Sequence, residues 1–146
     1  MKSVFMLEAL KEAKKAYNLG EVPVGAVIVK DDKVIAKAHN LCENKNDATM
    51  HAELIAIKKA MLKLNTKWLS DCELYVTLEP CPMCAGAIIN ARVKEVVFGA
   101  YDIKGGAVTS KTDLFNLGFN HKPTLFCGIN EKECKELLKD FFKDKR

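Results

Sequence analysis

The chain has 146 residues, of which 49% are hydrophobic and 29% are charged, and it is predicted to form one soluble globular domain over residues 1–146. No apolar run approaches the roughly 20 residues that a membrane helix needs, which excludes a protein built on spanning helices. The 23 basic and 19 acidic residues give a net charge of +4, which suits an anionic partner without requiring one. Charged residues interrupt the apolar ones near the start, unlike in a signal peptide, so we expect a cytoplasmic protein.

The first forty residues predict a helix followed by a hairpin. Apolar residues recur every three or four positions over 4–17, as on one face of an amphipathic helix. Two short runs rich in β-branched residues, 24–29 and 34–38, predict a pair of strands. Asp31 and Asp32 lie between these runs, where the turn of the hairpin is expected.

The remainder alternates between helical and strand patterns. Helices are predicted over 52–64 and 82–91 and from Asn130 onwards, with strands at 74–78, 96–100 and 124–127. Asn130 and Glu133 have the spacing of a capping box, and a long loop or short helices are expected over 101–123. This alternation predicts an α/β fold with helices on both faces of one sheet, whose strand order does not follow from the sequence.

The most informative residues form two short motifs. His-Ala-Glu at 51–53 is followed, after 26 intervening residues, by Pro-Cys-Pro-Met-Cys at 80–84. One imidazole, from His51, and two thiolates, from Cys81 and Cys84, make a three-ligand set for zinc, which prefers tetrahedral four-fold coordination. Water in the fourth position makes such a site catalytic, whereas a fourth side chain makes it structural. The combined pattern favours a catalytic zinc site.

The predicted elements place these residues at two helix starts. His51 and Glu53 lie where the helix over 52–64 begins, and Cys81 immediately precedes the helix that starts at Pro82. Helix N-termini favour negative charge and stabilise thiolates, so we expect two helix N-termini to converge on one metal. Two thiolates and a neutral imidazole leave a zinc centre without net charge, and such a centre acidifies its bound water less than one with only neutral ligands. A nearby proton acceptor is then useful, so Glu53 is predicted to accept a proton rather than to bind the metal.

The other cysteines and histidines have simpler interpretations. Six cysteines in a chain predicted to be cytoplasmic do not indicate a disulfide scaffold. Small, buried side chains are expected at the four cysteines outside the motif, Cys42, Cys72, Cys127 and Cys134. We expect His39 and His121 to be surface or loop residues rather than ligands.

These motifs resemble those of the zinc-dependent nucleobase deaminases of the cytidine and deoxycytidylate deaminase superfamily. The similarity is greatest to the bacterial tRNA-specific adenosine deaminases and extends over almost the whole chain, through residues 21–27, 47–53, 75–87 and 97–100, then Asp102 and Lys104, and residues 120–121 and 140–142. The resemblance implies a cytidine-deaminase-like three-layer αβα fold with a central mixed five-stranded sheet. It also implies that the protein is a homodimer.

The activity that the resemblance implies is hydrolytic deamination of adenosine to inosine at wobble position 34 of a tRNA anticodon. By the same resemblance, one Zn²⁺ per subunit would be held by His51, Cys81 and Cys84, and Glu53 would shuttle protons while activated water attacks C6 of adenine. The implied partner is the anticodon stem-loop of an arginine tRNA with adenosine at the wobble position, and no membrane is involved. Residues matching family contacts to the substrate or tRNA are Asn40, Asp102, Lys104, Asn120 and Phe142.

The residues themselves refine one of these contacts and leave two other functions open. Phe141 falls on the apolar face of the last helix, whereas Phe142 lies off that face and is the better stacking candidate. A deaminase of free guanine or cytosine shares the cysteine motif, although such an enzyme needs no outer contacts like Asp102 and Lys104. The second alternative is a non-enzymatic RNA-binding module stabilised by zinc. It would need a fourth protein ligand for the metal and would have no need for Glu53.

Overall fold

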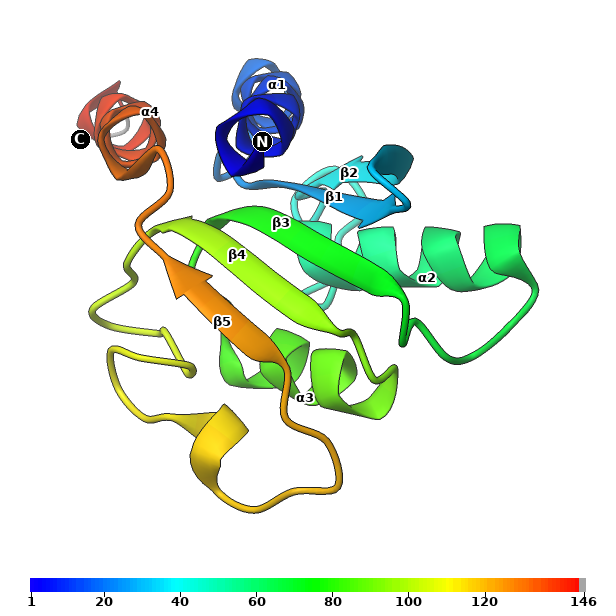
Figure 1. Ribbon diagram of the computed structural model, residues 1–146. Helices are drawn as coiled ribbons and strands as arrows, with labels where there is room; N and C mark the ends of the chain where they lie inside the picture. Colours follow the sequence, from blue (N-terminus) through cyan, green and yellow to red (C-terminus); the bar gives the residue numbers. More distant parts are fainter. Residues whose placement is uncertain (145–146) are drawn as a thin grey trace.

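The computed structural model describes residues 1–144. The elements in chain order, shown in Figure 1, are α1 (Lys2–Asn18), β1 (Gly25–Lys30), β2 (Lys33–His39), α2 (Ala52–Leu64), β3 (Cys72–Leu78), α3 (Pro82–Asn90), β4 (Glu95–Ala100), the 3-10 helix η1 (Leu114–Asn116), β5 (Thr124–Cys127) and α4 (Glu131–Asp144). The predicted helices and strands all form, within a few residues of the expected limits. None of the helices in residues 1–144 has the length and apolar character needed to span a membrane.

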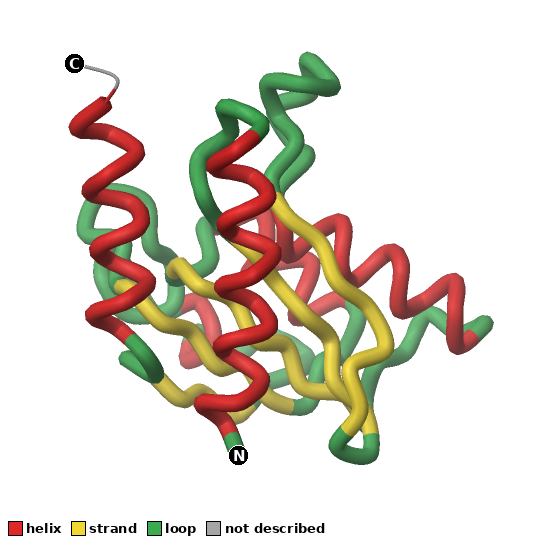
Figure 2. The backbone as a smooth tube through the Cα atoms, turned by 90° about the horizontal axis from the view of Figure 1, so that it is seen from above, coloured by secondary structure: helices red, strands yellow, loops and turns green. Residues whose placement is uncertain are grey.

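The five strands form one mixed sheet in the order β2-β1-β3-β4-β5. Strand β1 pairs antiparallel with β2 and β3, while β4 pairs parallel with β3 and β5. Helices α1 and α4 cover one face of the sheet, and α2 and α3 cover the other (Figure 1). Seen from above, α1 and α4 lie side by side across the strands (Figure 2). The predicted three-layer αβα fold with a mixed five-stranded sheet is therefore confirmed.

Two cores lie on opposite faces of this sheet because successive side chains of a strand point to opposite sides. Val76 and Phe98 belong to the core under α2 and α3. Val27 and Tyr75 belong to the second core, under α1 and α4. Burial of apolar surface on both faces holds the layers together. The strand periodicity therefore fixes how the helices are divided between the two sides.

Left-handed backbone occurs at the turn between β1 and β2 and at the start of α4. Asp31 and Asp32 both have positive φ, 52° and 59°, and close the predicted β1–β2 hairpin. The predicted capping box at α4 is wrong in its contacts. Asn130 has a φ of 56° and its Nδ2 donates to Glu133 Oε2 at 2.7 Å, while its Oδ1, the atom that would cap the helix, has no hydrogen-bond partner among the described residues.

Strand direction determines where a functional site can form. Strands β2, β3 and β4 run in the same direction, because β1 is antiparallel to both β2 and β3 and β3 is parallel to β4. The carboxyl ends of these three strands therefore lie at the same end of the sheet. The segments that follow these strands, residues 40–51, 79–81 and 101–113, gather there. Ligands of open α/β sheets bind just outside the carboxyl ends of the strands.

Candidate metal centre and adjoining groove

Two helices begin at the cluster that the sequence motifs predicted. His51 is the N-cap of α2 and Cys81 is the N-cap of α3, and neither side chain makes a capping hydrogen bond. Pro82 occupies the first turn of α3, where its fixed φ favours the helix and its missing N–H costs nothing. Cys84 follows in the same turn and is fully buried. Both helix N-termini thus direct their partial positive charge toward the imidazole and the thiols.

The geometry of the three side chains fits a zinc ion. Nδ1 of His51 lies 3.6 Å from Sγ of Cys81 and 3.7 Å from Sγ of Cys84. Zinc–sulfur bonds of about 2.3 Å and a zinc–nitrogen bond of about 2.0 Å place tetrahedral ligands about 3.5 Å apart. Within residues 1–144, no fourth His, Cys, Asp or Glu joins this group. The three donors therefore match an open zinc site rather than a closed structural one.

The protonation of these donors reflects how closely they lie together. Hydrogen bonds from Cys84 and His51 lower the pKa of the Cys81 thiol to about 4, despite the opposing effect of burial. The same thiol pair raises the pKa of Cys84, and the hydrogen bond to Cys81 raises the pKa of His51. One thiolate is thus already favoured without a metal. A divalent cation is what would allow both sulfurs to be thiolates side by side.

Glu53 is the buried carboxyl beside this cluster. It lies in the first turn of α2, two residues after His51, and is 4% exposed. Burial raises the pKa of its carboxyl to about 7, and the negative charge of Cys81 acts in the same direction. Its oxygens do not belong to the three-donor group. Glu53 is therefore placed next to the metal site without being part of the ligand set.

A pocket of about 220 Å³ opens over the cluster. His51, Glu53 and Cys81 contribute to its lining, Val24 and Leu78 give it apolar walls, and Asn40 also lines it. Drug-sized ligands occupy sites of roughly 300–1,000 Å³, so this volume suits a smaller group such as a single base. Oδ1 of Asn40 accepts a hydrogen bond of 2.8 Å from the backbone N–H of Ala52. Among the described residues, Nδ2 of Asn40 has no hydrogen-bond partner, so this donor is left for a ligand.

A wider groove of about 1130 Å³ adjoins the pocket through Val22, Leu78 and Asp102, which line both. Phe142 lines the groove and is 47% exposed, while the neighbouring Phe141 is 7% exposed and packs against Tyr17. Four lysines also line it: Lys104, Lys135, Lys139 and Lys143. The groove therefore combines an exposed ring with a concentration of positive charge, which is the surface that a nucleic acid strand requires.

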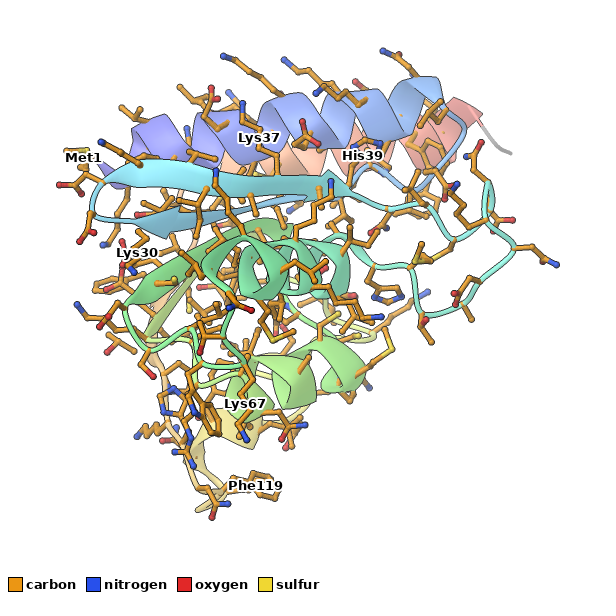
Figure 3. The ribbon with its side chains drawn as sticks, turned by 90° about the vertical axis from the view of Figure 1, so that its right-hand side faces the viewer. Met1, Lys30, Lys37, His39, Lys67 and Phe119 are labelled. Carbon is orange, nitrogen blue, oxygen red and sulfur yellow. The ribbon has the colours of Figure 1, made fainter. Side chains whose placement is uncertain are left out.

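One residue with an expected tRNA contact lies elsewhere. Asn120 is exposed in the segment before β5 and lines neither the pocket nor the groove. Its neighbour Phe119 projects at the end of the molecule opposite α1 (Figure 3). His121, also in this segment, contacts the backbone oxygen of Val93 through Nε2 at 2.6 Å. The structure thus brings Asn40, Asp102, Lys104 and Phe142 to the site and its groove, but not Asn120.

The remaining cysteines and His39 only partly follow expectation. Cys72 and Cys134 are buried, but Cys42 and Cys127 are only partly buried, so the prediction of fully buried side chains is wrong for these two. Cys42 follows β2 in a loop and lines the pocket, and Cys127 ends the edge strand β5. His39 lies on β2 beside α1, where Nδ1 contacts Glu12 Oε1 at 2.9 Å (Figure 3).

The sequence analysis missed two buried carboxylates that line the pocket, Glu21 and Glu79. Each accepts several hydrogen bonds from a loop that follows a strand. Glu21 lies between α1 and β1, immediately before Val22, whereas Glu79 follows the buried strand β3 and precedes Pro80, so the available signal was a lone glutamate beside a predicted strand. Charged residues are seldom fully buried unless they are paired, so a buried glutamate such as Glu21 or Glu79 is expected to accept hydrogen bonds from the backbone around it.

Comparison with known proteins gives consistent results. The profile of the MafB19-like deaminase family matches residues 2–146. A tRNA-specific adenosine deaminase of Bacillus subtilis is 48% identical over 144 residues, covering 98% of this chain and 89% of that protein. A structure solved in a study of A-to-I editing by tRNA:A34 deaminases at the wobble position is 44% identical, with a TM-score of 0.89, covering 92% of this chain and 98% of that one.

A guanine deaminase of Bacillus subtilis is also similar. Its structure is 42% identical, with a TM-score of 0.65, and the match covers 80% of this chain and 69% of that chain. The likeness to this enzyme is thus less complete in both fold and coverage. It nevertheless corresponds to the alternative of a free-base deaminase.

Proposed function

Because the chain belongs to the MafB19-like deaminases, and within them to the tRNA-specific adenosine deaminases, we propose that it converts adenosine to inosine at the wobble position of a tRNA anticodon. The protein is a hydrolytic deaminase with a His-Cys-Cys group typical of a zinc site. The observation that carries the proposal is the position of Glu53, which is buried beside three zinc donors and beneath a pocket sized for a base.

The chemistry follows from what each side chain can do. His51, Cys81 and Cys84 would hold one Zn²⁺ per chain, and zinc bound there supplies a Lewis acid that makes water more acidic. Glu53 takes a proton from the attacking water and delivers it to N1 of adenine, while the water oxygen bonds to C6. The second proton of that water, now on the hydroxyl at C6, passes to the amino group. The C6–N bond then breaks and ammonia leaves as the C6 carbonyl forms, so water and adenosine become inosine and ammonia. Asn40 orients the base through Nδ2.

The groove supports a polynucleotide substrate over a free base. Phe142 offers an exposed ring on which a neighbouring base can stack, and Asp102 lies where the pocket opens into the groove. Lys104 and the three lysines of α4 supply charge for phosphates. An anticodon loop presents its bases unstacked, so placing one of them in the pocket costs less than extruding a base from a duplex.

The proposal also includes a homodimer, an arginine tRNA as substrate and a tRNA contact at Asn120, which the resemblance implies. A cytoplasmic location is proposed because charged residues interrupt the apolar ones near the start of the sequence. A single domain over residues 1–146 is supported by the one continuous sheet and the two cores that flank it.

The decisive experiment uses purified, zinc-loaded protein and an anticodon stem-loop with adenosine at the wobble position, with free guanine and free cytosine in parallel. We expect inosine in the RNA and no change in either free base. Glu53→Gln should abolish turnover and retain one zinc per chain. Glu12→Gln, which alters a buried carboxylate paired with Lys15 and His39, is the matched control and should still form inosine.

The alternatives have distinct outcomes. Deamination of guanine with inert RNA would establish a free-base deaminase and overturn the substrate assignment. Bound RNA with no deamination of any substrate would indicate a non-enzymatic module. Loss of zinc from Glu53→Gln would contradict the role given to Glu53 and make it a ligand or a structural residue.

A further inference from the structure

Glu79 is a buried carboxylate between β3 and the metal ligand Cys81, and the reaction described above gives it no task. It is 2% exposed and directly follows the last residue of β3. Its backbone N–H donates to the oxygen of Ala100 at 2.8 Å, which joins the ends of β3 and β4. The side chain therefore lies beneath the segment that leaves β4, residues 101–111, which we name the β4 loop.

The carboxylate of Glu79 accepts its hydrogen bonds from the β4 loop. Oε1 accepts from the backbone N–H of Asp102 at 3.1 Å and from the hydroxyl of Ser110. Oε2 accepts from three consecutive amides, those of Val108 at 3.3 Å, Thr109 at 2.9 Å and Ser110 at 2.8 Å. These amides lie in irregular backbone, so Glu79 satisfies donors that a helix or a sheet would otherwise satisfy.

The loop backbone lies directly against this carboxylate. A Cβ atom added to Gly106 would lie 2.2 Å from Cδ of Glu79 and 2.4 Å from each carboxylate oxygen. The N–H of the next residue, Ala107, donates to the oxygen of Pro80 at 2.9 Å. Contacts on both sides thus fix the β4 loop against the segment that leads into Cys81.

The β4 loop carries two of the predicted RNA contacts. Oδ1 of Asp102 accepts from the amides of Lys104 at 3.3 Å and Gly105 at 3.1 Å, which folds this part of the loop into a turn. Asp102 lines both the pocket and the groove, and Lys104 lines the groove. The position of these side chains relative to the metal ligands therefore depends on the shape of the loop that Glu79 holds.

We propose that Glu79 is a positioning residue for RNA binding, which fixes the β4 loop so that Asp102 and Lys104 meet the nucleotides beside the reacting base. The proposal rests on the proposed function, since it assigns a role in binding the same RNA. Glu79 lies at the wall of the pocket, but both of its carboxylate oxygens accept from the β4 loop and it is not one of the metal donors, so it acts through the loop. Its loss therefore affects the binding of RNA more than the rate of the chemical step.

The test compares RNA affinity with turnover. Glu79→Gln keeps the size of the side chain but replaces one acceptor oxygen with an NH₂ group, which cannot accept from loop amides. We expect the Kd of the anticodon stem-loop, measured by fluorescence anisotropy in the Glu53→Gln background, to rise at least about tenfold. With Glu53 intact, KM should rise similarly, while kcat changes by less than about threefold and zinc stays at one per chain.

A second variant tests whether weaker RNA binding in Glu79→Gln comes only from the lost negative charge. Gly106→Ala keeps every charge but places a methyl group in the space of the carboxylate, so it should displace the loop and raise Kd in the same way. Glu12→Gln is the matched control, because Glu12 is also a buried carboxylate with two partners but belongs to the α1–β2 contact. It should lower Tm without changing Kd.

The outcomes separate this inference from the proposed function. If the unmodified protein does not deaminate the stem-loop, the proposed function fails. If it does, but Glu79→Gln and Gly106→Ala lower Tm or kcat and leave Kd and KM within about twofold of the starting values, then Glu79 has only a structural role. Weakened RNA binding in both variants, with zinc retained, would support the inference.

Discussion

The Asn40 side chain joins the end of β2 to the start of α2 through the hydrogen bond of 2.8 Å between its Oδ1 and the N–H of Ala52. This bond satisfies one of the free amides in the first turn of α2, where the N-cap residue His51 makes no capping bond. The same side chain lines the pocket. One amide group therefore supports the helix with its oxygen and leaves its nitrogen for the substrate.

Two substitutions separate these tasks of Asn40. Asn40→Asp keeps an acceptor for Ala52 but removes the Nδ2 donors, so we expect nearly unchanged stability and loss of most turnover. Asn40→Ala removes both groups and should also lower the free energy of unfolding by about 1 kcal/mol, the usual value of a helix cap. Urea unfolding and single-turnover inosine formation measure the two effects. Full turnover in Asn40→Asp would disprove the contact between Nδ2 and the base.

Removal of one thiol should remove the metal. Cys84→Ser leaves two donors, which hold zinc far more weakly than three, so we expect most of the zinc and the turnover to be lost. Cys127→Ser is the matched control, because this partly buried thiol ends β5 outside the metal group. Zinc content by mass spectrometry and inosine formation are measured together. Retention of one zinc per chain in Cys84→Ser would contradict the assigned ligand set.

The two adjacent phenylalanines of α4 should differ in their effects. Phe142→Ala should weaken binding of the stem-loop by about 1–3 kcal/mol, the range for stacking of one base on a ring, with little loss of stability. Phe141→Ala should instead lower the free energy of unfolding by about 3 kcal/mol, because Phe141 is buried. Anisotropy and urea unfolding distinguish the two variants. Equal affinity for RNA in Phe142→Ala would rule out stacking on this ring.

Stability should depend on pH through Glu21. Burial alone would raise its pKa, but hydrogen bonds from the side chain and backbone of Asn44 and from the backbone of Glu43 hold the pKa below 4.5. The folded chain thus binds fewer protons, so the stabilisation is complete above 4.5 and is lost as the pH falls through the folded-state pKa. Glu21→Gln should cost about 1–3 kcal/mol at pH 7 and progressively less in acid.

Urea unfolding of both proteins at neutral and acidic pH measures this difference. A constant gap between the unmodified protein and Glu21→Gln at every pH would show that the charge of Glu21 contributes nothing to the acid dependence.

The sequence predicted most elements because their signals are local. Helical spacing marked α1 and α2, and β-branched runs around Asp31 and Asp32 marked the hairpin. The pairing of β3 with β4 was not predictable, because parallel strands joined through α3 leave no signal in their own residues. The capping box failed at Asn130, whose left-handed backbone does not allow the usual cap.

The metal donors were predictable because their spacing alone restricts the chemistry, and the structure brings all three together. The β4 loop was not predictable in shape. Its amides bond to Glu79, a residue 23 to 31 positions away, so the contact depends on the folded sheet and not on the loop sequence. The exposure of Cys42 had the same origin, since residue type alone does not show which loop lines the pocket.

His51 and Cys81 are 30 residues apart in the chain, but Nδ1 of His51 lies 3.6 Å from Sγ of Cys81. An ion bound to both residues would cross-link the chain and close a loop of 30 residues, as a disulfide between these positions would. Such a cross-link reduces the number of conformations open to the unfolded chain. For a disulfide, loop entropy gives a restraint of this length roughly 3–4 kcal/mol. None of the six cysteines forms a disulfide in the described structure. With zinc bound, the proposed centre would thus also act as a reversible cross-link, and loss of the ion would destabilise the fold as well as stop the reaction.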